Sequence, residues 1–136
     1  MLNVVKPVKT KTPVCHTLVV EDDPLGRDSL RAILQRLGHS VSVTSSLAGA
    51  FHELRPDAPE MPQCLLLDLM LPDGSGVELL RRIREDQLPI RVAVMTGQFD
   101  PPTIDRVKSF EPEALFYKPL DVPKLAAWLK VVAKAS

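Results

Sequence analysis

The 136-residue sequence predicts an α/β fold in three layers, a doubly wound parallel sheet of five strands with helices on both faces. Two observations predict it. Short β-rich runs alternate five times with amphipathic helical patterns, which is typical of successive β–α units. Two of the runs, "QCLLLDL" and "IRVAVMTG", are apolar at consecutive positions, so both faces of these strands are expected to be buried.

The first unit pairs the β-rich run "CHTLVV" with the helical pattern in "DPLGRDSLRAILQRLG". Apolar residues at Leu30, Ile33, Leu34 and Leu37 lie three or four positions apart, as on one face of a helix. Asp23 before Pro24 is the predicted N-cap with proline in the first turn, and Gly38 is the predicted stop.

The later units follow the same order. The second has the strand "SVSVT" and a helix capped by Ser45 or Ser46, and the loop "RPDAPEMP" follows. The strand "QCLLLDL" leads through the turn "PDGSG" to the helix "VELLRRIRE". After "IRVAVMTG" comes a weak helix in "DPPTIDRVKSF", where only Ile104 and Val107 share an inner face. The strand "ALFY" and a final helix, capped by Asp121, complete the pattern.

Composition restricts the class of protein. Seventeen basic and seventeen acidic residues balance, so charge gives no indication of nucleic-acid or membrane-surface binding. No apolar run reaches the ~20 residues that span a bilayer. Residues 1–13 are predicted to be a flexible basic arm without the features of a secretory signal, residues 14–136 to be one domain, and the location to be cytoplasmic. Cys15 and Cys64 lie in apolar segments, which favours buried free thiols over a disulfide or metal pair.

Polar residues gather where the predicted strands end. Glu21 and Asp22 follow the first strand, Asp68 ends the third, Thr96 ends the fourth and Lys118 follows the fifth. In open parallel sheets, ligands bind at the carboxyl ends of strands near the switch in strand order. These carboxylates, one hydroxyl and one ammonium are therefore expected to converge at one edge.

Crowded carboxylates repel one another unless a cation is present. Oxygen-only ligands suit Mg²⁺, with Mn²⁺ as the alternative. A carboxylate beside such a metal can act as a nucleophile toward a phosphoryl group and form an aspartyl phosphate. The Lys118 ammonium could pair with the phosphoryl oxygens, and the Thr96 hydroxyl could donate a hydrogen bond to them.

Four motifs, "LVVEDDP", "LLLDLMLPDGSG", "VMTG" and "YKPL", have the order and spacing found in receiver domains of two-component response regulators. The sequence resembles this family over roughly residues 15–134. The resemblance implies a (βα)5 flavodoxin-like fold with strand order 2-1-3-4-5. It also implies a signalling domain rather than an enzyme with turnover on a separate substrate.

The resemblance assigns roles to single residues. Asp68 would be the phosphoacceptor, with a histidine kinase or histidine phosphotransfer protein as the donor. Asp22 would bind Mg²⁺ directly and Glu21 through water, Met70 would supply its backbone carbonyl, and Asp68 would complete the metal site.

By the same resemblance, Thr96 matches the switch hydroxyl, Lys118 the lysine that contacts the phosphoryl group, and Pro119 a proline that follows a cis peptide bond. Leu115 stands where the family often has an aromatic switch residue, which puts that switch in doubt. Met70 has no polar side chain, so slow self-dephosphorylation is expected.

Two other functions are weighed against a phosphorylation switch. One is a receiver-like docking module that needs no phosphate, and the complete acid and lysine set argues against it. The other is a phosphatase of the haloacid dehalogenase type, which uses an acid where this sequence has Met70.

An unknown output partner is expected on the face formed by the fourth helix, fifth strand and fifth helix. A dimer that forms on phosphorylation is also compatible with the sequence. No DNA-binding segment follows the domain, so direct nucleic-acid binding is not expected, nor is membrane binding. A stand-alone chain, a fragment of a longer regulator and the receiver of a hybrid kinase all fit the sequence.

Overall fold

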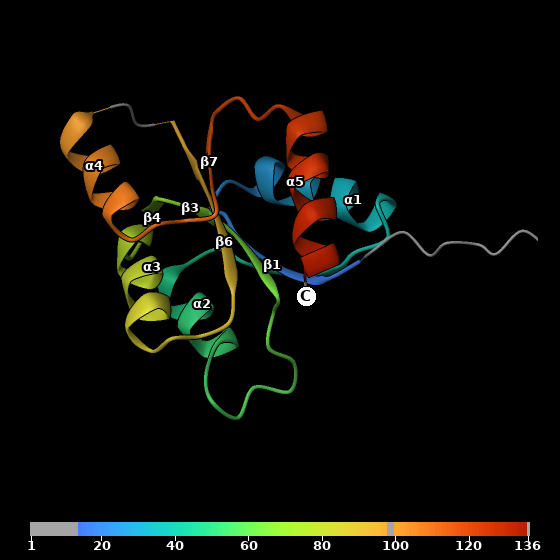
Figure 1. Ribbon diagram of the computed structural model, residues 1–136, viewed down its shortest axis with the longest axis horizontal. Coiled ribbons are helices and arrows are strands. Elements are labelled where there is room, and N and C mark those ends of the chain that lie inside the picture. The colour runs from blue at the N-terminus through green and yellow to red at the C-terminus, as the bar shows by residue number, and fades with distance from the viewer. Residues whose placement is uncertain (1–13, 98–99, 136) are drawn as a thin grey trace, which may run out of the picture.

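A five-stranded parallel sheet forms the centre of the protein, in a computed structural model that describes residues 14–97 and 100–135 (Figure 1). The strand order is β2-β1-β3-β6-β7, which confirms the predicted order 2-1-3-4-5. The predicted arm, residues 1–13, lies outside the described residues. The strands are β1 (His16–Val20), β2 (Ser40–Thr44), β3 (Cys64–Asp68), β6 (Arg91–Thr96) and β7 (Ala114–Tyr117).

Helices cover both faces of this sheet, with α1 and α5 on one side and α2, α3 and α4 on the other (Figure 1). Alternate residues of β3 enter the two cores: Leu65 and Leu67 pack under α2, α3 and α4, whereas Leu66 packs under α1 and α5. The prediction that β3 is buried on both faces is therefore confirmed. The helices are α1 (Pro24–Arg36), α2 (Leu47–Glu53), α3 (Gly76–Glu85), α4 (Pro101–Ser109) and α5 (Val122–Ala135).

The helix ends follow the capping residues in the sequence. The Asp23 side chain accepts from the Gly26 backbone N–H at 3.0 Å, ahead of Pro24 at the first helical position. Ser46, one of the two serines considered, caps α2, and Asp121 accepts from the Lys124 N–H at 3.2 Å. Within the described residues, no helix is long and apolar enough to cross a membrane.

A small hairpin lies between β3 and α3. The sequence predicted its turn but not its two short strands. Strands β4 (Met70–Leu71) and β5 (Gly74–Ser75) pair antiparallel. In its turn, Asp73 accepts hydrogen bonds from the backbone N–H groups of Leu47 and Ala48, at 2.7 and 2.8 Å. The hairpin after β3 thus caps the start of α2, since these first-turn donors have no partner inside the helix.

The two helices that follow the hairpin are packed unequally. Helix α3 buries five residues, whereas α4 buries Ile104 and Val107, the two that the sequence predicted. The Arg84 guanidinium of α3 donates to the backbone oxygens of Phe110 and Glu111, each at 3.0 Å, and pairs with Glu113 at 2.9 Å. This network attaches the end of α4 and the approach to β7 to α3.

Candidate functional site

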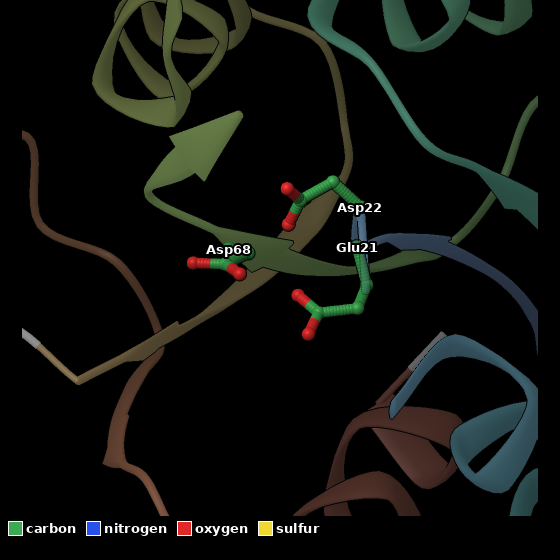
Figure 2. Close-up of side chains that lie close together, drawn as sticks. All are labelled: Glu21, Asp22 and Asp68. Atoms are coloured by element: carbon green, nitrogen blue, oxygen red, sulfur yellow. The ribbon is translucent and has the colours of Figure 1, made fainter. Parts of the chain in front are cut away.

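Three carboxylates meet at the carboxyl ends of β1 and β3, as Figure 2 shows. One oxygen from each of Glu21, Asp22 and Asp68 lies within 4.8 Å of the others. Glu21 and Asp68 are buried, whereas Asp22 is exposed. The Glu21 backbone N–H donates to the Thr44 oxygen at 3.1 Å, which fixes the end of β1 against β2.

Lys118 brings the fifth strand into the same cluster. It follows β7 directly, and its backbone N–H donates to the Thr96 oxygen at 2.8 Å. Its Nζ lies 2.9 Å from an Asp68 oxygen and 3.0 Å from a Glu21 oxygen. The predicted convergence of acids and lysine at one sheet edge is present, and Lys118 bridges the two buried acids.

The electrostatics of the buried acids differ from one to the other. Burial, together with the adjacent Asp68 carboxylate, raises the pKa of Glu21 to about 7. Burial also raises the pKa of Asp68. The hydrogen bonds that Asp68 makes with Glu21, Lys118 and the Met70 backbone N–H outweigh burial, so the Asp68 pKa is lowered. Burial lowers the pKa of Lys118, and its bonds to both acids outweigh that effect and raise it. The cluster therefore has an ionised Asp68, a charged Lys118 and a Glu21 that titrates near neutrality.

Thr96 and Met70 flank the cluster. Thr96 is the last residue of β6 and is almost fully buried, beside the strand end that carries Asp68. The Met70 backbone N–H donates to an Asp68 oxygen at 3.1 Å, while the Met70 side chain is 61% exposed. Both residues lie where the sequence placed them: Thr96 at the end of β6 and Met70 just after the end of β3.

Close packing explains how Asp68 is positioned. A Cβ on Gly76 would collide with the Asp68 backbone oxygen, so the first residue of α3 passes too close to β3 for any side chain. This contact was not predicted from the sequence, and neither were the hydrogen bonds that Asp73 accepts from the start of α2. The "DG" and "SG" pairs in the predicted turn were the available signal.

The fold and the cluster together define a flavodoxin-like α/β protein with an acidic site at the strand ends. The chain belongs to the response regulator receiver domain family, whose family model matches residues 17–130. The family resemblance noted from the sequence is thereby confirmed.

Relatives and solved structures agree with this family. The chain is 35% identical over 117 residues to the TorCAD operon transcriptional regulatory protein TorR of Escherichia coli. This alignment covers 85% of this chain and 48% of TorR. It is 30% identical to the transcriptional regulatory protein FixJ of Bradyrhizobium diazoefficiens, covering 85% of this chain and 55% of FixJ. The chain thus spans about half the length of these relatives.

The fold also matches solved receiver domains. A CheY-like response regulator receiver domain protein from Methanospirillum hungatei superposes with a TM-score of 0.81 at 22% identity. The match covers 90% of this chain and 95% of that one. At this identity the similarity supports the fold alone.

Proposed function

We propose that this chain is a phosphorylation-dependent signalling switch in which Asp68 accepts a phosphoryl group from a histidine kinase or a histidine phosphotransfer protein. The observation that carries the proposal is the surroundings of Asp68. Its carboxylate is buried, is ionised, and lies with two other acids and the Lys118 ammonium at one sheet edge. An ionised carboxylate is the form that attacks phosphorus.

The donor set fits Mg²⁺. Three carboxylates and one lysine leave net negative charge in a partly buried cluster, which favours a hard divalent cation with oxygen ligands. Asp22 and Asp68 are the direct ligands in this proposal, with Glu21 acting through water and Met70 through its carbonyl. When bound, the ion offsets charge on the phosphoryl oxygens. Mn²⁺ satisfies the same ligand chemistry.

Lys118 and Thr96 respond to the added group. In the unphosphorylated protein the Lys118 ammonium pairs with Asp68 and Glu21. A phosphoryl group adds roughly −1.5 to −2 charges, so Lys118 moves its pairing to the new oxygens and the Thr96 hydroxyl donates to them. Because Thr96 ends β6 and Lys118 directly follows β7, this change bears directly on the lightly packed α4 and on α5.

The face formed by α4, β7 and α5 is the proposed contact for the output partner. Tyr117, at the end of β7, is 42% exposed on it. The relatives are named transcriptional regulatory proteins, so control of transcription by a larger assembly is the proposed output. The proposal places the domain at residues 14–136, in the cytoplasm, as a signalling domain rather than an enzyme.

Treatment with acetyl phosphate and Mg²⁺, followed by intact-protein mass spectrometry, tests this function. The parent protein should gain the mass of one phosphoryl group. Asp68→Asn should abolish the gain, and omission of Mg²⁺ should reduce it strongly. Asp57→Asn, in an exposed carboxylate away from the cluster, is the matched control and should phosphorylate like the parent.

Equal phosphorylation of the parent and Asp68→Asn would contradict the proposal. No phosphorylation of a folded parent would favour the alternative, a docking module that needs no phosphate. Sustained release of phosphate from a phosphomonoester would instead indicate a phosphatase.

A further inference from the structure

We propose that Cys15 and Cys64 form a redox-active dithiol pair, which a peroxide-class oxidant converts into an intramolecular disulfide between β1 and β3. This inference goes beyond the proposed phosphorylation switch and does not depend on it. The pair lies at the opposite ends of β1 and β3 from the acidic cluster.

The geometry carries the proposal. The two sulfur atoms lie 3.0 Å apart although the residues are 49 positions apart in sequence. Cys15 immediately precedes β1 and Cys64 begins β3, and Thr17 is the register partner of Cys64. Both sulfurs therefore lie on the same face of the sheet, under α1 and α5. A disulfide needs about 2.05 Å between sulfurs, so closure requires a shift of about 1 Å.

The surroundings make Cys15 the attacking thiol. Its sulfur lies 3.5 Å from the Thr17 hydroxyl and 3.8 Å from His39 Nδ1, and its backbone N–H donates to the same Nδ1 at 3.1 Å. Hydrogen bonding from Cys64, helped by Thr17 and His39, lowers the pKa of Cys15 to about 6 despite burial. The bond to Cys15 and burial raise the pKa of Cys64. One thiolate and one thiol are thus held in contact.

The chemistry balances with hydrogen peroxide as oxidant. The Cys15 thiolate attacks one peroxide oxygen and breaks the O–O bond, which gives a sulfenic acid and hydroxide. The Cys64 sulfur then attacks the Cys15 sulfur and displaces the hydroxyl group, which leaves as water with the Cys64 proton. The hydroxide takes up the proton that Cys15 released on ionising, so in sum two thiols and one peroxide become one disulfide and two waters. Both cysteines are buried, at 3% and 0% exposure, which restricts access to small oxidants.

Intact and peptide mass spectrometry on the folded protein test the proposal. After hydrogen peroxide treatment and quenching, the monomer should lose the mass of two hydrogen atoms. Without reductant, the Cys15 and Cys64 peptides should be linked, and dithiothreitol should separate them. These are the only two cysteines, so no other intramolecular disulfide competes. The same treatment in urea should link them at least about tenfold more slowly, since the native fold holds them together.

Single variants separate the two roles. Cys64→Ser should leave Cys15 as a sulfenic acid that dimedone traps when it is added in urea, whereas Cys15→Ser should leave Cys64 unreactive toward peroxide. The oxidised parent should melt higher than the reduced one, by on the order of 10 °C, because the disulfide closes a long loop. Circular dichroism checks that each variant is folded.

Three outcomes would overturn the proposal. In the first, both thiols can still be alkylated when the peroxide-treated parent is quenched and then unfolded. In the second, oxidation stops at sulfinic acid without a crosslink. In the third, the crosslink forms as fast in urea as in the native state.

Discussion

The two central strands, β1 and β3, end differently. At their carboxyl ends, three carboxylates and Lys118 form a cluster whose charges are not balanced. At their amino ends, the two cysteine sulfurs touch in the core under α1 and α5, with Thr17 and His39 beside them. Between them lie fully buried leucines and valines. The strands therefore end in an acidic cluster that we propose binds a cation, and begin at a thiol pair that we propose is sensitive to oxidation.

A cavity in the buried middle of β3, between the acidic cluster and the thiol pair, should destabilise the whole fold. Leu66 lies two residues from Cys64 and two from Asp68, and is fully buried. Leu66→Ala should lower the free energy of unfolding by about 3 kcal/mol, measured by urea denaturation. Leu25→Ala, at a position 78% exposed, is the control and should change it by less than about 0.5 kcal/mol. If Leu66→Ala unfolds like the parent, the two ends are not joined by a tightly packed core.

Without divalent ions, the acidic end should make the protein less stable as pH rises. The pKa of Glu21 is raised from 4.5 to about 7, so the native state binds more protons than the unfolded state between these values. The free energy of unfolding should fall by on the order of 2 kcal/mol over that window. Glu21→Gln should remove this loss in urea titrations with a chelator. The lowered pKa of Asp68 acts below pH 3.8 and the raised pKa of Lys118 above pH 10.5, outside the window.

Metal binding should be confined to the acidic end. Asp22→Asn removes one proposed Mg²⁺ ligand from an exposed position, so refolding is not at issue. We expect a roughly tenfold loss of Mg²⁺ affinity, about 1.4 kcal/mol, by calorimetric titration. The rate at which peroxide links Cys15 to Cys64 should stay unchanged in the same variant. A change in that rate would show that the two ends are coupled.

The Cys15–Cys64 pair should make the free energy of unfolding change with pH in the opposite direction, and this is the smallest of the predicted effects. The pKa of Cys15 is lowered from 9 to about 6, so the unfolded state binds more protons than the native state between these values. The free energy of unfolding should rise with pH across this window, by on the order of 1 kcal/mol. Cys15→Ser should abolish the rise and leave the fall due to Glu21 intact. Parallel slopes in both variants would contradict the assignment.

Local sequence patterns predicted most of the fold. Buried strands were recognisable because β3 and β6 are apolar at consecutive positions. The start of α1 was recognisable because Asp23 and Pro24 are adjacent, and the weak packing of α4 because only Ile104 and Val107 share a face. These signals depend on neighbours in sequence, which periodicity reports directly.

Contacts between distant residues were not recognisable in the same way. The predicted strand order brought Asp68 and Lys118 to one edge, but the bridge that Lys118 makes to Glu21 depends on side-chain direction. The contact between Cys15 and Cys64 depends on the register of β1 against β3, which no local pattern specifies. The sequence correctly predicted free, buried thiols without predicting that they touch.

The Arg84 network gives α4 a fixed end. Arg84 holds the backbone of Phe110, the C-cap of α4, while the N-cap Asp100 lies ten residues earlier at the other end of this nine-residue helix. At 1.5 Å per residue the helix is about 13 Å long. A pivot of about 10° around the Phe110 anchor would therefore carry the far end by about 2 Å. We expect α4 to act as a lever, turning a change of one bond at the strand ends into a displacement that a partner can sense.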